Sequence, residues 1–218
     1  MKPDYEAAAL KATETLIKYG VSFAPVLALP ILKRIPGVLV LSFAEMANDI
    51  GVDRKHILQA FGDNQDSIAL VEQVDGKLKY IVGYNQRLPL YMGERALARE
   101  LGHIILKHDG SKQEDVRLEE AETFCRYLLF PRPLIHAIQQ TEIPFTTDVL
   151  GNMTGCYDRC QRLLRKTPGI RIPAEMNRRI RAQFADYIDN YMEYLSILAA
   201  TDESPLADLG TFMDNYEE

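Results

Sequence analysis

The feature that most limits the fold of this chain is a pair of apolar runs on either side of Asp75-Gly76. Residues 68–74 are IALVEQV and residues 77–84 are KLKYIVGY. An Asp-Gly pair between such runs favours a β-hairpin, because both central residues of its tight turn take positive φ. We therefore predict an antiparallel strand pair at this point of the chain.

Helical spacing dominates most of the remaining sequence. Residues 5–19 place apolar side chains on one side of a helix that Gly20 ends, and VLVLSF at residues 38–43 is typical of a short strand. Further helices are expected from about Ser42 to Gly51, over residues 54–61, 93–107 and 114–130, in two short pieces over 147–166, and from 173 to about 199. The predicted fold class is α+β, with a small antiparallel sheet and its hairpin packed by helices.

A chain of 218 residues corresponds to one domain, or to one domain with a helical extension. We expect an α+β core over residues 1–140 and a helical C-terminal region over residues 141–200. The last segment, residues 201–218, is acidic and is expected to form a loosely held tail.

Composition excludes several classes of protein. Lys and Arg number 25 and Asp and Glu number 31, for a net charge of -6, and this lack of a basic footprint argues against nucleic acid as a partner. No segment has the apolar length of a signal peptide or a membrane span, so a cytoplasmic location is expected. Cys156 and Cys160 are four residues apart; two helix-packing thiols are favoured over a metal or redox pair.

Two of the four histidines lie in one short segment, RELGHIILKH, at residues 99–108. The active helix of a zinc peptidase carries two histidines one turn apart, so that both reach one ion. A glutamate beside the first histidine acts as general base on the zinc-bound water. Here Glu100 and His103 occupy the positions of the glutamate and the second histidine, and Arg99 occupies that of the first.

Two segments resemble the ImmA/IrrE family of metallopeptidases. Residues 96–108, ALARELGHIILKH, are similar to its active helix, T-L-A-H-E-L-G-H-x-x-L-x-H. Residues 119–131, EEAETFCRYLLFP, are similar to its second helix, E-x-E-A-N/D-x-F-A-x-x-L-L-x-P. With a Pro-rich N-terminal segment, the hairpin and a helix-turn-helix-like stretch at residues 149–165, the resemblance covers most of residues 1–165.

The resemblance implies a zincin-like metallopeptidase core with zinc as cofactor. Members of the family act in phage, mobile elements and stress responses, where they cleave or bind a helix-turn-helix repressor. By the same resemblance, Glu100 is the general base and His103 is a metal ligand, and we take Glu119 as a further ligand that depends on the register of the second helix.

The sequence departs from the family pattern at two ligand positions. The first zinc ligand falls on Arg99, whose guanidinium has no lone pair to give to a metal. Counting back without gaps from Pro131, the third falls on Leu118, which cannot bind a metal either. Glu119 and Glu120 are next to it and serve as ligands if the register differs.

Several of these residues have a structural interpretation beside the functional one. Glu100 is either a general base or a salt-bridged glutamate, and His103 is either a metal ligand or a hydrogen-bonded histidine between two helices. His108 is expected to cap a helix and to lie off the ligand face. Leu118 is expected to belong to an apolar core row with Ala121, Cys125 and Leu128.

Arg99 has a further interpretation of its own. In place of the ion, its guanidinium is expected to pair with a carboxylate and so to hold the two helices together. Glu100, Glu119 and Glu122 are the carboxylates available for this pairing.

Two functions follow from these observations. The first is a catalytically degenerate relative that acts in regulation by binding a protein or peptide partner, such as a repressor. The second is an active zinc-dependent endopeptidase that cleaves such a repressor, with Glu100 as general base. The substitution at Arg99 favours the first function.

Overall fold

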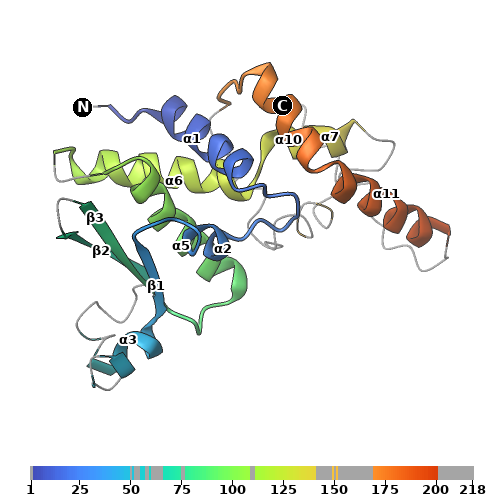
Figure 1. Ribbon diagram of the computed structural model, residues 1–218. Helices are drawn as coiled ribbons and strands as arrows, with labels where there is room; N and C mark the ends of the chain where they lie inside the picture. Colours follow the sequence, from blue (N-terminus) through green and yellow to red (C-terminus); the bar gives the residue numbers. More distant parts are fainter. Residues whose placement is uncertain are drawn as a thin grey trace.

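The computed structural model shows a small sheet with helices on both of its faces (Figure 1). It describes residues 2–49, 51, 55, 56, 59, 66–74, 77–108, 111–140, 149, 151 and 169–200. The described elements are, in chain order, α1 (Tyr5–Lys18), α2 (Ala28–Leu32), β1 (Val38–Ser42), α3 (Phe43–Asp49), β2 (Ser67–Val74), β3 (Lys77–Tyr84), α5 (Leu90–Ile105), α6 (Glu114–Leu129), α7 (Arg132–Gln139), α10 (Ala174–Gln183) and α11 (Ala185–Ala200).

The three described strands form one sheet in the order β1-β3-β2. β2 and β3 pair antiparallel from Val74 opposite Lys77 to Ser67 opposite Tyr84, which confirms the predicted hairpin; its turn lies outside the described residues. β1 pairs with β3 in parallel, so the sheet is mixed and not antiparallel throughout as expected. The hairpin pattern defines only the β2–β3 pair, whereas β1 reaches β3 over a long connection that no local motif specifies.

Alternation along the strands gives the sheet two apolar faces. One face carries Leu41, Ile68 and Ile81, which pack against Phe43, Met46 and Ala47 of α3. A Cβ atom on Gly83 would lie 2.5 Å from the Met46 sulfur, so α3 sits directly on the strand. The other face carries Val40, Ala69 and Val82 and belongs to the main core under α5.

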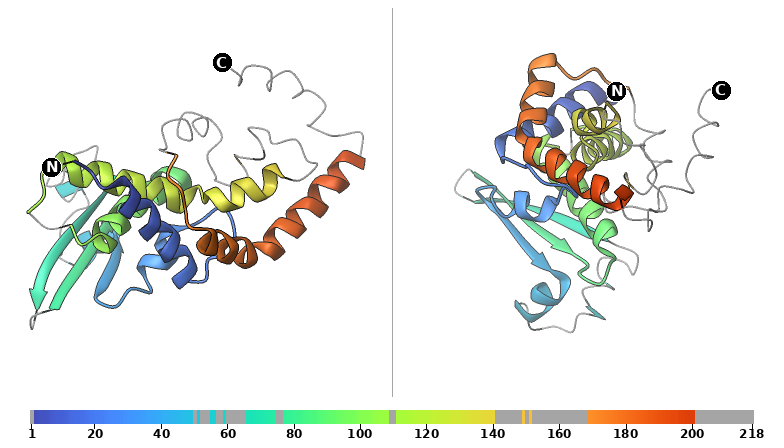
Figure 2. Two further views of the ribbon diagram at one scale, coloured as in Figure 1. Left: turned by 90° about the horizontal axis from the view of Figure 1, so that it is seen from above. Right: turned by 90° about the vertical axis from the view of Figure 1, so that its right-hand side faces the viewer.

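Three helices are stacked closely above that main core. Ala8, Ala9 and Ala12 of α1 are all 0% exposed, and these small side chains let α1 lie close to α6. α5 approaches α6 closely at Gly102, where an added Cβ would lie 3.1 Å from the Phe124 ring and 3.3 Å from the Ala121 backbone. The candidate motif helix is therefore held from above by α6 and from below by the sheet (Figures 1 and 2).

The N-terminal end of α5 is fixed to α2 by a buried carboxylate. Glu94 is 8% exposed and accepts hydrogen bonds from the backbone N–H groups of Ala28 (2.5 Å) and Leu29 (3.2 Å). These N–H groups begin α2 and have no partner inside their own helix. Burial raises the pKa of Glu94, against the lowering effect of these two hydrogen bonds.

Two helices at the C-terminal side of the fold were expected as one. α10 ends at Gln183 and α11 begins at Ala185, with Phe184 between them at 0% exposure. The Gln183 side chain donates to the carbonyl groups of Leu16 (2.9 Å) and Val21, which fixes this break to the end of α1. The chain therefore bends where Phe184 enters the core, and α11 extends away from the body (Figure 2).

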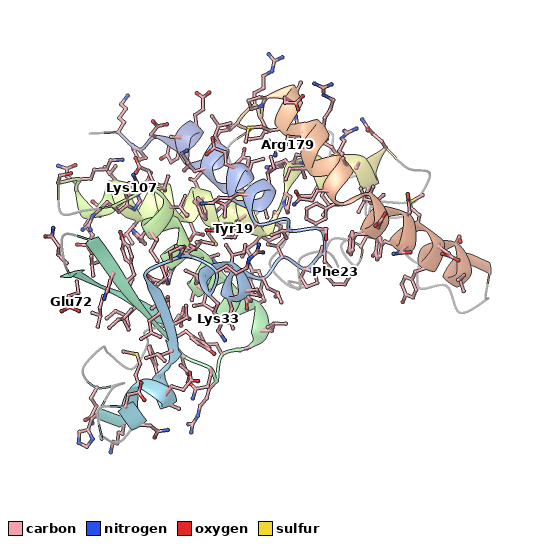
Figure 3. The ribbon with its side chains drawn as sticks, viewed as in Figure 1. Tyr19, Phe23, Lys33, Glu72, Lys107 and Arg179 are labelled. Carbon is pink, nitrogen blue, oxygen red and sulfur yellow. The ribbon has the colours of Figure 1, made fainter. Side chains whose placement is uncertain are left out.

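An aromatic row follows along α11. Tyr187 and Tyr191 stack with ring centroids 5.9 Å apart, and Tyr194 continues the row at 6.2 Å. Phe23, labelled in Figure 3, meets the Tyr187 ring edge-on at 5.4 Å. This row extends the stripe that Ile180 and Phe184 begin in the core.

The structure confirms the predicted α+β fold class and most of the expected elements. The strand at 38–43, the helix that follows Ser42 and the two motif helices are all present. Ser42 and Glu45 form a capping box, since Ser42 Oγ accepts from the Glu45 N–H (3.1 Å) and Glu45 accepts from the Ser42 N–H (2.6 Å). Several predictions fall outside the described residues. They concern most of the two short helices at 147–166 with Cys156 and Cys160, nearly all of the helix at 54–61, residues 141–148, and the tail at 201–218.

Candidate functional site

Glu100 and His103 lie on the side of α5 that faces the hairpin. Glu100 accepts a hydrogen bond of 2.8 Å from the hydroxyl of Ser67, the first residue of β2. Burial raises the pKa of Glu100, while the Ser67 hydrogen bond and the charge of Arg99 lower it. The carboxylate is thus held in place at the junction of helix and sheet, in surroundings that favour uptake of a proton.

Both residues line one pocket between the hairpin, α5 and the start of α6. The pocket has a volume of about 260 Å³ and is open on one side. Its walls are Ala69, Val71 and Tyr80 from the hairpin, Glu100, His103 and Ile104 from α5, His108 from the following turn, and Glu114, Arg117 and Leu118 from α6. The two helix motifs of the sequence therefore meet at a single place, as the resemblance predicts.

The turn after α5 brings His108 back against His103. Lys107, labelled in Figure 3, has a φ of 53°, in the left-handed region. The His108 N–H donates to the His103 carbonyl (3.0 Å) and the Lys107 N–H donates to the Ile104 carbonyl (3.2 Å). These two bonds form a Schellman motif, which is the capping role expected for His108.

The His108 ring does more than the capping role requires. Its Nδ1 lies 2.8 Å from Nδ1 of His103, and its Nε2 lies 2.8 Å from Oε2 of Glu120 on α6. Its side chain is 1% exposed and that of Glu120 is 3% exposed. A chain of three hydrogen-bonding groups therefore runs from α6 into the pocket.

Which nitrogen donates in each of these hydrogen bonds follows from Glu120 at one end. The Glu120 carboxylate can only accept, so Nε2 of His108 donates to it. Nδ1 of a neutral His108 then carries a lone pair and accepts from Nδ1–H of His103. Nε2 of His103 is left with its lone pair, which is the form of imidazole that binds a metal or takes up a proton.

Burial and nearby charges favour the neutral form of the two histidines, and hydrogen bonds favour the ionised form of Glu120. Burial, with the charges of His108, Arg117 and Arg99, lowers the pKa of His103 to about 4. Burial also lowers the pKa of His108, against the raising effect of Glu120. For Glu120, burial raises the pKa, but hydrogen bonds from Lys112, the Asp4 N–H and His108 outweigh it and lower the pKa overall.

Glu120 also connects the site to the N-terminus. Lys112 Nζ lies 2.7 Å and 3.0 Å from its two carboxylate oxygens, and the Asp4 N–H donates to Oε1 over 2.9 Å. A buried carboxylate with this many donors is fully satisfied. Glu120 therefore fixes His108, the start of α1 and the loop before α6 in one arrangement.

The expected pairing of Arg99 with a carboxylate is wrong. Each of the three acids proposed for it has another partner: Ser67 for Glu100, Tyr5 for Glu119 and Arg95 for Glu122. No ion pair of Arg99 is present within the part of the chain that the structure describes. Arg95 lies one turn before Arg99 and holds α5 to α6 through Glu122 at 2.8 Å.

The two possible third-ligand positions differ in where they point. Leu118 lines the pocket and is 47% exposed, so the expectation that it belongs to the core is wrong. Glu119 is exposed and accepts a hydrogen bond from the Tyr5 hydroxyl of α1. The structure thus brings Leu118, and not Glu119, together with Glu100 and His103.

The donor set in the described residues does not fit a zinc ion. Zinc sites use at least three Cys, His, Asp or Glu ligands that converge on one point. No group of three or more such side chains is arranged in this way among the residues that the structure describes. Arg99 replaces one ligand, Leu118 stands at another, and His103 contributes a single imidazole.

The chain was compared with models of known protein families. Residues 53–157 match the sequence model of the IrrE N-terminal-like domain, which is peptidase family M78. This segment of the chain is similar to an IrrE N-terminal-like domain. This confirms the resemblance seen in the two helix motifs, although the match begins at residue 53 and so leaves out the Pro-rich N-terminal segment. No curated protein and no solved structure matches the chain.

Three residues, His108, Ser67 and Arg117, belong to the site although the sequence analysis did not place them there. His108 was placed off the ligand face because it follows His103 by five residues, whereas the turn at Lys107 brings its ring back to His103. Ser67 is the first residue of β2, and Arg117 occupies a polar position in the sequence pattern of α6. For these two residues the sequence contains no signal, since only the tertiary fold brings them to the pocket.

None of the described helices has the length and apolar character that crossing a membrane requires.

Proposed function

We propose that this M78 domain is catalytically degenerate and acts by binding a protein or peptide partner, such as a repressor. The observation that carries the proposal is the pocket itself. It keeps Glu100 and His103 of the peptidase pattern, while a leucine occupies the wall where a third metal ligand is expected. Leu118 and Val71 are 47% and 55% exposed on the walls of the same pocket, and apolar surface there supports contact with another molecule better than metal chemistry.

The free edge of β2 supports an extended peptide as the partner. The Asn85 N–H donates to the Asp66 carbonyl (2.9 Å), so the hydrogen-bonded pairs of β2 and β3 continue with Ile68 opposite Gly83 and Leu70 opposite Ile81. The backbone groups of Ala69 and Val71 therefore point away from β3, toward the edge of the sheet. A peptide strand that adds to an exposed edge uses groups of this kind.

The same two residues also face the pocket with their side chains. Ala69 and Val71 are two positions apart in the strand and line the pocket wall, and Val71 is 55% exposed. In the described chain β2 pairs only with β3. A bound strand would thus lie along β2 with alternate side chains directed toward Glu100, His103 and Leu118.

An active zinc endopeptidase is the second candidate function. The observations in its favour are the raised pKa of Glu100 and the free Nε2 lone pair of His103 in the same pocket. Zinc, if bound there, would activate a water molecule for attack on a peptide carbonyl. The residues present supply too few ligands for this function, so the binding role is preferred.

Metal content separates the two functions. We would measure zinc in the purified protein, in Arg99→His and in the double variant Arg99→His/Leu118→Glu, all prepared without chelator. We expect substoichiometric zinc in the first two proteins and about one zinc per chain in the double variant, because the two introduced side chains would complete a set of three ligands with His103. Near-stoichiometric zinc in the unmodified protein, with peptide cleavage that Glu100→Gln abolishes, would establish the peptidase and overturn our proposal.

A further inference from the structure

Arg117 is the unpaired cation of the pocket. Its Nε is buried and has no hydrogen-bond partner, and no ion pair of Arg117 is present among the described residues. Arg126 Nε is also buried without a hydrogen bond, but it lies 3.4 Å from Glu122, which pairs with Arg95 as well at 2.8 Å. Burying a guanidinium without a counter-charge is costly, and a carboxylate bound in the pocket would offset that cost.

The other charged groups of the pocket do not neutralise Arg117. Glu100 is directed to Ser67, and Glu114 is exposed at the first position of α6. His103 and His108 are bonded to each other, and Glu120 beyond them is bonded to Lys112. The charge of Arg117 contributes to the low pKa values of both histidines, so its field extends across the pocket.

We propose that Arg117 binds the carboxylate of an Asp or Glu side chain in a peptide strand that lies along β2. This inference rests on the proposed function, and it adds the chemical class of the partner: an extended segment with an acid at one defined position. Guanidinium and carboxylate groups match in geometry and form two parallel hydrogen bonds.

The shape of the pocket favours a peptide side chain over a free anion. Arg117 lines the same pocket as the apolar side chains of Leu118, Ala69 and Val71, so a bound side chain can combine apolar contact with the guanidinium. A volume of about 260 Å³ accommodates one or two side chains. The acid of the pocket on the same helix is Glu114, three residues before Arg117, and it would compete with a bound carboxylate.

The test uses a random heptapeptide library on phage, selected against the full chain. Four further targets are Arg117→Gln, Arg117→Glu, Glu114→Gln and Val71→Pro, each checked for folding by its thermal transition. Val71→Pro removes an outward N–H of β2 and no bond to β3, so it blocks strand addition with little effect on the sheet.

We expect peptides selected by the unmodified protein to carry Asp or Glu at one position. A selected peptide should bind about tenfold more tightly than its counterpart with Gln or Asn there, as one charge-assisted interaction predicts. Arg117→Gln should bind the two peptides equally, Arg117→Glu should select Lys or Arg at that position, and Glu114→Gln should bind the acidic peptide more tightly. Val71→Pro should bind neither peptide.

The contrary outcomes distinguish this inference from the proposed function. Peptides that require the β2 edge but show no preference for an acid, or keep it in Arg117→Gln, would overturn the role of Arg117 alone. Peptides that bind Val71→Pro as well as the unmodified protein would show that they bind elsewhere and would overturn both. Failure to select any peptide would count against the binding function itself.

Discussion

The two sides of α5 differ in how many residues of the family pattern they keep. Toward α6, Gly102 and Leu101 are buried in contacts so close that an added Cβ would lie 3.1 Å from Phe124. Toward the hairpin, Glu100 and His103 border an open pocket. The packing side of the pattern is intact in this chain. The metal-binding part of the pattern is not, because Arg99 replaces one ligand and Leu118 stands at another.

The difference shows that the packing of this domain does not depend on the metal chemistry. Helix approach at Gly102 needs small residues and aromatic complementarity, and it is satisfied by Ala121 and Phe124 without any ligand. Arg99 and Leu118 are accommodated at a partly exposed surface, where substitutions perturb packing little. A domain of this kind can therefore keep its shape while its site changes chemistry.

The largest expected effect is on the packing side. Gly102→Val should lower the free energy of unfolding by at least about 3 kcal/mol, because the new side chain meets the Phe124 ring and the Ala121 backbone. Urea titration followed by circular dichroism measures this change. Gly93→Ala in the same helix is the matched control: its Cβ would meet nothing closer than 4.0 Å, so it should stabilise the helix. Equal losses in both variants would contradict the comparison.

The second effect concerns pH and the histidine chain. The pKa of His103 is lowered from 6.5 to about 4, so between these values the unfolded chain binds a proton that the folded chain does not. Stability is therefore complete above about pH 6.5 and falls as the pH falls toward 4, by about 2 to 3 kcal/mol for this group. Urea midpoints from pH 7.5 to 4.5 should decline more steeply in the unmodified protein than in His103→Gln. Parallel declines would show that His103 is not buried as a neutral base.

The third effect is the loss of the carboxylate that supports this chain. Glu120→Gln should cost about 2 kcal/mol, because it removes the charge that Lys112 and His108 contact in a buried position. Glu119→Gln, one residue earlier and exposed, should leave thermal stability nearly unchanged. If the two variants melt alike, Glu120 does not organise the site.

The sequence predicts the elements of this fold better than it predicts the site. The hairpin, the strand at 38–43 and the two motif helices follow from turn chemistry and periodicity, which act over a few residues. The parallel pairing of β1 and the bend at Phe184 depend on tertiary packing, and local patterns do not contain that information. The same limit explains why Leu118 was expected in the core, since its apolar spacing does not show that this face of α6 borders an open pocket.

The sequence predicted those site residues whose spacing on one regular helix forms a motif. Glu100 and His103 were found from a spacing of three residues on one helix, and the structure brings them to one pocket. The contact between His108 and Glu120 could not be predicted, because it depends on a chain reversal at Lys107. A lysine gives no sequence signal for the left-handed conformation that this turn uses. Arg117 required the tertiary position of α6 relative to β2.

The turn at Lys107 gives a fourth, smaller effect on the pocket side. A lysine at a φ of 53° is strained, and glycine has no such penalty. Lys107→Gly should therefore stabilise the protein by about 1 kcal/mol and keep the contact between His103 and His108. Lys107→Val should destabilise it by a similar amount, because a β-branched residue tolerates this conformation least. Thermal unfolding of the two variants checks the sign, and a loss of stability with glycine would show that the lysine side chain itself is needed.

The smallest expected change in stability is that of Leu118→Asn, and it tests most directly whether the pocket side and the packing side differ. Leu118 is 47% exposed on the pocket wall, so Leu118→Asn removes little buried apolar surface and should change the free energy of unfolding by less than about 0.5 kcal/mol. Leu128→Asn, on the packing side of the same helix at 0% exposure, is the matched substitution and should cost several times more. If Leu118→Asn destabilises the protein as strongly as Leu128→Asn, the leucine is part of the core after all. A neutral result in Leu118→Asn, together with weaker binding of the selected peptides, would mean that this residue is retained for contact with a partner.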